Sequence, residues 1–205
     1  PCTVHVSRGG YFLISLYFEV IWLESLPLGN RYGYRKMTQD INEAEIADLF
    51  GPPGLNHNDQ RFFFTLNDQE LAIAHKIRRR DQRCMFVVLL GYFKVKPITL
   101  SPGYHQIKQD IKYVCSEIFP GSGLRPFNLT QKTRVRIYQR IYKITNHQRW
   151  ENDRHSAALA KDLAPEIAFD RAIEYLSAQK ISAPGYTVLQ DIVSGAVGMT
   201  NRGLI

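Results

Sequence analysis

From residue 37 onward the hydrophobic positions recur three or four residues apart, the spacing of an α-helix that turns one face to a core. Two Asn-x-x-Glu pairs have the pattern of capping boxes at helix N-termini, Asn42 with Glu45 and Asn67 with Glu70. Gly51 ends the first of these helices, and Pro97 stops a later, very apolar one. The residues that set the period are Leu71, Ala74, Ile77, Met85, Val88, Leu89 and Tyr92. The pattern predicts helices throughout this part.

The same signals continue toward the C-terminus. The residues expected to open further helices are Ser101 with Pro102, Thr130, Asp153, Pro165, and Thr187 with Gln190. Strand signals are sparse, because the apolar runs 62–65 and 86–88 are too short or too continuous to require a sheet. We therefore predict an all-α, multi-helical fold of seven or eight helices, with a first module over residues 37–120 and a second over 121–205.

The first 36 residues differ from this pattern. The apolar run 11–23 has thirteen residues and includes Glu19, whereas a membrane span needs about 20. It is also a poor signal peptide, because Arg8 is the one basic residue before it and no small-residue cleavage site follows. Since Met37 opens the helical part, we expect residues 1–36 to be upstream or non-native sequence. The alternative is a genuine apolar element that packs on the body.

The charged residues are distributed unevenly along the chain. The chain of 205 residues carries a net charge of +7, which favours an anionic partner such as nucleic acid or a membrane surface. Residues 37–117 hold ten basic and ten acidic side chains, and residues 151–205 hold five basic and seven acidic ones. Residues 118–150 hold seven basic side chains and no acidic one: Arg125, Lys132, Arg134, Arg136, Arg140, Lys143 and Arg149. Solvated helix faces usually mix both signs, so this window favours contact with phosphates.

The helix expected after Thr130 is amphipathic in a way that suits DNA. Steps of four, four and three residues place the cations Lys132, Arg136, Arg140 and Lys143 on one face. The residues assigned to the opposite, packed side are Val135, Tyr138, Ile141 and Tyr142. A helix with a basic outer face can bind duplex DNA. The first candidates for DNA contact are Arg134, Arg136 and Arg140.

A second basic cluster precedes it in the chain. Its members are Lys76, Arg78, Arg79, Arg80 and Arg83. Cations packed so closely repel one another, and an anionic ligand would relieve that repulsion. Pairing of one or two of these arginines with Asp68, Glu70 or Asp81 explains the pattern equally well.

The sequence contains no enzyme signature. The glycines at 121 and 123 follow a proline and lack the Lys-Ser/Thr of a phosphate-binding loop. The six histidines have no metal-ligand spacing, and the three cysteines, Cys2, Cys84 and Cys115, form neither a disulfide framework nor a zinc motif. Cys84 and Cys115 fall on apolar helix faces, where core packing is expected. We therefore predict no catalytic residue, no metal site and no cofactor.

Several of these segments, in this order, resemble the N-terminal region of the replicative transposases of the Tn-three family. The matching stretches are 49–52, 64–66, the run 78–83 followed by 85–92, the basic and aromatic segment 133–150, and 184–189. The resemblance covers residues 37 to 197. It implies a helical region that binds the terminal inverted repeats of a transposon, with the two basic clusters as DNA-contacting elements of two consecutive modules.

The resemblance also implies what the chain lacks. The family's metal-binding Asp, Asp, Glu triad lies far downstream in a much longer protein, so no catalytic residue carries over to these 205 residues. The tail 195–205 looks abrupt and suggests a truncated gene, a frameshift or a cut chain. We expect a non-catalytic DNA-binding fragment in the bacterial cytoplasm, associated with the nucleoid when bound, with double-stranded DNA and another transposase chain as partners.

The sequence also fits two other classes of protein. A helical protein-interaction module would assemble with another transposase chain, and a truncated copy would then act as an inhibitor. A membrane-surface protein would use residues 11–23 together with the basic helix, although we expect no membrane partner.

Overall fold

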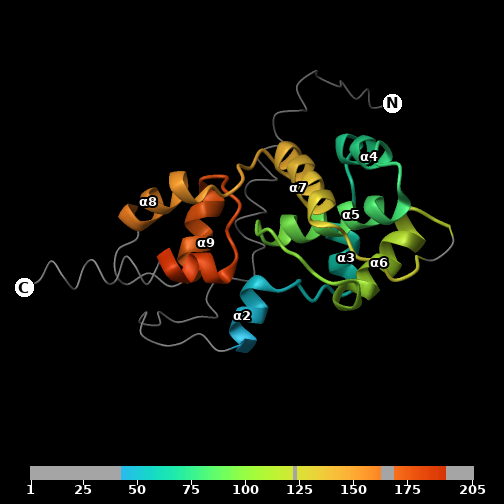
Figure 1. Ribbon diagram of the computed structural model, residues 1–205. Helices are drawn as coiled ribbons and strands as arrows, with labels where there is room; N and C mark the ends of the chain where they lie inside the picture. The colour runs from blue at the N-terminus through green and yellow to red at the C-terminus, as the bar shows by residue number, and fades with distance from the viewer. Residues whose placement is uncertain (1–42, 122–123, 163–168, 193–205) are drawn as a thin grey trace, which may run out of the picture. The chain divides into compact units, whose positions relative to one another are not determined.

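Helix α5 (Arg80–Val95) is apolar on every side between Cys84 and Phe93, and its neighbours pack around it (Figure 1). In the computed structural model, which describes residues 43–121, 124–162 and 169–192, every residue of α5 from Cys84 to Phe93 is buried. A helix that is hydrophobic all round is stable in water only inside a core. Helices α3, α4, α6 and α7 all contact α5, which makes it the centre of the fold.

Three short helices lead into α5. Helix α2 (Glu43–Phe50) ends at Gly51, as the sequence predicts, whereas its expected cap Asn42 lies outside the described residues. Helix α4 (Asp68–His75) begins with the predicted capping box: Asn67 Oδ1 accepts from the Glu70 amide at 2.9 Å, and Glu70 Oε2 accepts from the Asn67 amide at 3.0 Å. The sequence analysis missed helix α3 (His57–Phe63), although Asn56 and Asp59 form a second complete capping box before it.

Beyond α5 the chain turns back along it. The 3₁₀ turn η1 (Tyr104–Ile107), helix α6 (Lys108–Tyr113) and the π-helical turn η2 (Val114–Ile118) form one nearly continuous segment. The segment starts at Tyr104, two residues after the predicted start at Ser101 and Pro102. Its apolar face packs on the core, because Ile107, Ile111, Val114 and Cys115 are buried and Ile118 is half-buried.

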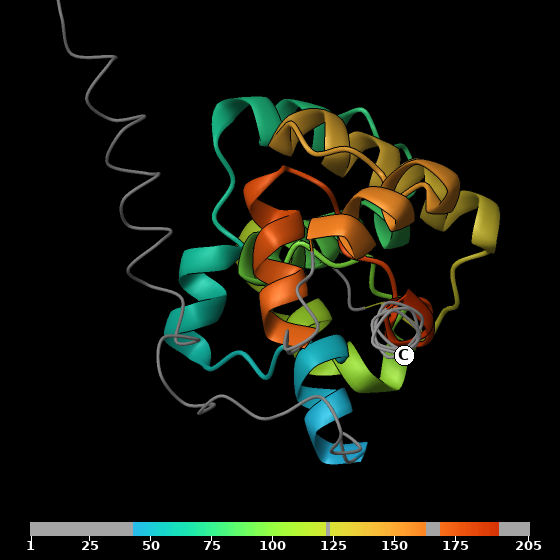
Figure 2. The same cartoon turned by 90° about the vertical axis from the view of Figure 1, so that its left-hand side faces the viewer.

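The remaining helices follow the long helix α7 (Gln131–Thr145). They are α8 (Asn152–Asp162), α9 (Phe169–Ala178) and a helical segment over 186–192. Helices α8 and α9 lie side by side in both views (Figure 1, Figure 2). Thr187 falls inside the last segment instead of capping it, and the predicted helix start at Pro165 lies outside the described residues.

The segments before α8 and after α9 hold the C-terminal part to the end of α5. Two isolated parallel bridges join Ile98 to Ala183 and Gln148 to Ile181. The Ala183 amide donates to Pro97 O at 2.9 Å, and the hydroxyls of Thr99 and Ser182 lie 3.0 Å apart. Apart from these two bridges, the described part of the chain pairs no strands, so the predicted all-α fold is confirmed there.

One hydrophobic cluster runs through the described residues on both sides of residue 120. It includes Phe86 and Ile111 from the first predicted module and Ile141, Leu159 and Leu176 from the second. The division of residues 37–205 into two modules stays a prediction. The expected leader 1–36, its apolar run 11–23 and the tail 195–205 all lie outside the described residues.

Candidate nucleic-acid interface

Helix α7 has well-defined ends. Thr130 precedes it with an extended backbone, and its Oγ1 accepts from the Thr133 amide at 3.3 Å. Asn146 ends it in the left-handed conformation (φ 54°), a position that asparagine tolerates better than most residues, and its amide donates to Tyr142 O. The predicted cap at Thr130 is therefore confirmed. Hydrogen bonds at Thr130 and Asn146 therefore fix both ends of α7.

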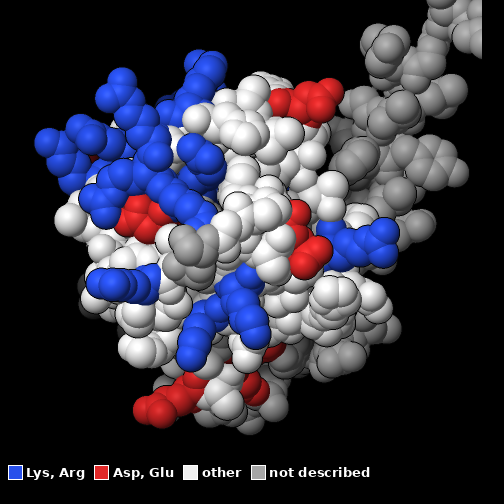
Figure 3. Space-filling view, turned by 90° about the vertical axis from the view of Figure 1, so that its right-hand side faces the viewer, with Lys and Arg blue, Asp and Glu red and all other residues white. Residues whose placement is uncertain are grey.

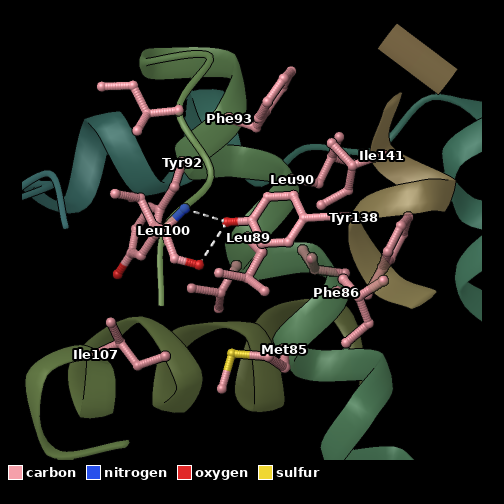
Figure 4. Packing of buried hydrophobic residues seen from close by; sticks show 14 of the residues in the cluster. Met85, Phe86, Leu89, Leu90, Tyr92, Phe93, Leu100, Ile107, Tyr138 and Ile141 are labelled. Carbon is pink, nitrogen blue, oxygen red and sulfur yellow. Dashed lines mark hydrogen bonds between the residues drawn. The ribbon is translucent and has the colours of Figure 1, made fainter. Parts of the chain in front are cut away.

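The inner face of α7 is seated on the core. Ile137, Tyr138, Ile141 and Tyr142 are buried, so the packing assigned to both tyrosines is confirmed, whereas Val135 is only half-buried. The Tyr138 hydroxyl accepts from the Leu100 amide at 2.7 Å and donates to Leu100 O at 2.9 Å (Figure 4). Burial raises the pKa of Tyr138, so the hydroxyl keeps the proton that it donates.

This double hydrogen bond fixes α7 against the segment that follows α5. The Tyr142 hydroxyl adds a second link 2.6 Å from Thr99 Oγ1, and the Tyr142 ring meets Phe93 edge to face with centroids 5.8 Å apart. Since α7 also contacts α4 and α5, its rotation about its own axis is determined by packing. The opposite face must then point to solvent.

The outer face of α7 carries four exposed cations and one exposed amide. These side chains are Lys132, Arg136, Gln139, Arg140 and Lys143. Within the described part of the chain, no carboxylate forms an ion pair with any of the four cations. The contact between Arg140 Nη1 and Arg136 O, at 3.5 Å, stays within the helix. Their positive charge is therefore free to act on an anion in solvent.

Arg134 does not belong to this face. It lies two residues from both Lys132 and Arg136, which at 3.6 residues per turn is on the far side of the helix. It is half-buried, and its Nη1 donates to Gln131 Oε1 at 3.2 Å. The structure thus brings together two of the three first candidates, Arg136 and Arg140.

The other two cations of the acid-free window flank the helix. Arg125 is exposed in the segment that leads into α7, and Arg149 is exposed in the segment that leads out of it. Both are accessible, although neither lies on the helix itself.

The earlier basic cluster separates into exposed and engaged side chains. Lys76 and Arg78 are exposed. The Arg79 guanidinium pairs with the Asp81 carboxylate at 2.6 Å, as one of the two sequence interpretations expects, and Glu70 pairs instead with Lys94 at 2.9 Å.

Arg80 and Arg83 bind backbone carbonyls. Arg80 Nη2 donates to Phe119 O at 2.9 Å. Arg83 donates to Ile77 O from Nε at 3.2 Å and from Nη2 at 2.9 Å, and its guanidinium lies 5.4 Å from the centre of the Phe119 ring. These two arginines hold the segment 76–79 to the end of η2. Their position indicates a structural role for them, whereas Lys76, Arg78 and the Asp81-paired Arg79 are exposed to solvent.

The two basic regions lie on neighbouring elements. Helix α4, whose C-cap is Lys76, packs against α7. The face shown in Figure 3 has Lys and Arg side chains gathered at its upper left, with few Asp and Glu side chains among them. A polyanion can therefore meet cations from more than one element.

Three groups of kinds that can support catalysis, Asp110, Cys84 and Cys115, are buried and packed in the core. The buried Asp110 carboxylate accepts from Gln60 Nε2 at 2.8 Å and from the Tyr92 hydroxyl. Cys84 and Cys115 are buried with their sulfur atoms 3.4 Å apart, and burial raises the pKa of Cys84 to about 12, which suppresses the reactive thiolate. Across residues 43–121, 124–162 and 169–192, no three His, Cys, Asp or Glu side chains gather as a metal site would require.

Sequence reasoning missed Gln139 because it selected residues by charge. The signal was available: Gln139 lies seven residues after Lys132, three after Arg136 and four before Lys143. Those intervals place it on the same side of the helix as all three cations.

Comparison with known proteins gives a family match. Residues 41–196 match a family described as "Domain of unknown function (DUF4158)". The chain belongs to this family. A search of curated proteins gives no match, and neither does a search of solved structures. None of the DUF4158 helices described is both long and apolar enough to cross a membrane.

Proposed function

We propose that this DUF4158 protein binds double-stranded DNA through the outer face of α7. The observation that carries the proposal is a rigidly seated helix whose solvent face holds Lys132, Arg136, Arg140 and Lys143 with no paired carboxylate among the described residues. Each cation that contacts a phosphate releases condensed counterions, which is the main source of affinity for DNA.

The electrostatics predict how binding depends on salt. Four phosphate contacts give a slope of about −3.6 in log K against log salt concentration, or a loss of about 100-fold between 50 and 200 mM salt. Lys76 and Arg78 steepen the slope further if the DNA also reaches the end of α4. Phosphate contacts set the position of the helix on the duplex, and base contacts supply specificity.

The biological role that we propose is recognition of transposon terminal inverted repeats by the non-catalytic N-terminal part of a Tn-three family transposase. Support comes from the sequence resemblance over residues 37 to 197 and from the position of the basic face on an all-α scaffold. In this role the chain acts in the cytoplasm of a bacterium and has no catalytic activity of its own.

A protein-interaction module is the alternative. Such a module is expected to expose a sizeable apolar patch. Phe62, 61% exposed, and Val188, 39% exposed, are the large hydrophobic side chains at the surface of the described residues. Two isolated side chains favour this alternative less than the basic face favours DNA.

The test is fluorescence anisotropy of the full 205-residue chain on two labelled duplexes across a salt series. One duplex carries a Tn-three-type terminal repeat, and the other carries the same bases scrambled. Binding that is at least about 10-fold tighter to the repeat near physiological salt supports end recognition. Equal and steeply salt-dependent binding supports only the basic surface, and no binding to either duplex contradicts the proposal.

A further inference from the structure

The outer face of α7 contains one group that can distinguish bases without adding charge, the amide of Gln139. This side chain is exposed, and among the residues that the structure describes no group hydrogen-bonds it. Lysine and arginine side chains that contact phosphates do so regardless of sequence, whereas a carboxamide has a donor and an acceptor in one plane. That pair of groups matches the N7 acceptor and N6 donor that adenine presents in the major groove.

The position of Gln139 along the helix fits this role. Lys132 and Lys143 are eleven residues apart, about 16 Å along the helix axis. The major groove is about 12 Å wide and admits an α-helix. A helix that crosses the groove with these two lysines at its rims puts each ammonium beside a phosphate strand. Gln139 lies between them, three residues after Arg136, on the side of the helix that faces the floor of the groove.

The fixed rotation of α7 gives the amide a defined direction. The two hydrogen bonds of Tyr138 to Leu100 and the burial of Ile141 hold the inner face, so the outer face cannot roll away from the groove. A base-reading side chain requires this kind of support, because a small misplacement loses the bidentate geometry.

We infer that Gln139 is a specificity-determining residue that reads an adenine in the major groove of the bound duplex. The inference rests on the proposed function, since it assumes that α7 meets DNA. It goes beyond that function by assigning one base to one side chain. A bidentate pair of this kind is expected to discriminate adenine from other bases by roughly 5- to 150-fold.

The experiment is a selection from a randomised double-stranded DNA pool with the full chain and three variants. We expect the wild-type chain to enrich adenine at one position and Gln139→Ala to lose the preference there. Gln139→Glu is expected to change the preference to cytosine, because a carboxylate accepts from the cytosine N4 amino group. Its overall affinity falls, since the new charge repels the phosphates.

Gln179→Ala is the matched control, because Gln179 is an exposed glutamine outside α7. It is expected to select the same sequences as the wild-type chain. If Gln139→Ala and Gln139→Glu also select the wild-type sequences, the assignment of Gln139 is overturned while DNA binding stands. If the wild-type chain retains no DNA from the pool, the proposed function itself fails, and the inference fails with it.

Discussion

Removing one oxygen atom from Tyr138 tests how α7 is held. The hydroxyl satisfies both backbone groups of Leu100, at 2.7 Å to the amide and 2.9 Å to the carbonyl oxygen. Tyr138 is 3% exposed and Leu100 is 4% exposed, so water has little access to either backbone group. Tyr138→Phe preserves the ring and leaves the Leu100 amide and carbonyl without a partner.

The cost follows from those two unsatisfied groups. A buried polar group that loses its partner costs about 1–3 kcal/mol, so the loss of two partners is expected to lower the unfolding free energy by about 2–6 kcal/mol. In a protein whose total stability is about 5–15 kcal/mol, this is a large fraction. Tyr142→Phe is the matched control, because its hydroxyl bonds the exposed Thr99, which water can satisfy instead. That variant is expected to lose no more than about 1 kcal/mol.

Urea unfolding followed by far-UV circular dichroism measures both variants against the wild-type chain. An unchanged slope with a midpoint lower by roughly 1–3 M is expected for Tyr138→Phe. Equal midpoints for Tyr138→Phe and Tyr142→Phe refute the reasoning, because the double hydrogen bond would then add nothing beyond an ordinary surface contact.

Three further outcomes are expected. In thermal melts Gly91→Ala loses about 1–3 kcal/mol despite alanine's higher helix propensity, because the new Cβ meets the buried Phe64 ring at 2.3 Å; a higher melting temperature contradicts this. Arg83→Ala loses about 1–3 kcal/mol in urea unfolding because both hydrogen bonds to Ile77 O disappear, and Arg83→Lys recovers only part of the loss; no change in either variant argues against a structural Arg83. Burial lowers the pKa of His147, so the stability that its neutral form contributes is present above pH ~6.5 and lost as the pH falls below it. The melting temperature is therefore expected to fall less between pH 7.5 and pH 5.5 in His147→Gln than in the wild-type chain. Equal falls in the two proteins contradict this prediction.

The all-α fold and several helix starts could be predicted because their signals are local. Asn67 with Glu70 and the lone Thr130 each place a side-chain oxygen where a helix leaves amides unpaired, and both caps form as predicted. Helix α3 was not predicted, because the three consecutive phenylalanines at its end were interpreted as a weak strand signal and the Asn56–Asp59 capping box before them was overlooked.

The candidate site was predictable only in part. Helical spacing was enough to place Arg136 and Arg140 together, and the same spacing, applied strictly, separates Arg134 from them. The roles of Arg80 and Arg83 depend on the backbone carbonyl groups of Phe119 and Ile77. Because every residue has such a carbonyl group, the sequence does not indicate which ones accept these hydrogen bonds. A basic cluster therefore predicts charge, whereas the fold decides which of its members face solvent.

The most direct test of the central claim compares two sets of four alanine substitutions in the full chain. One set removes Lys132, Arg136, Arg140 and Lys143 from the outer face of α7. The other removes four exposed cations outside α7: Arg61, Lys108, Lys112 and Arg154. Both sets lower the net charge by the same amount, so only the position of the lost charge differs.

The measurement is duplex DNA affinity by fluorescence anisotropy from 50 to 200 mM salt. If the outer face of α7 binds the phosphates, the first set reduces the salt slope by about 3 to 4, so binding weakens most at low salt and most of the roughly 100-fold fall in affinity from 50 to 200 mM disappears. The second set should keep a slope close to that of the wild-type chain. Equal losses in the two sets would contradict the account, because DNA would then respond to net charge and not to this helix.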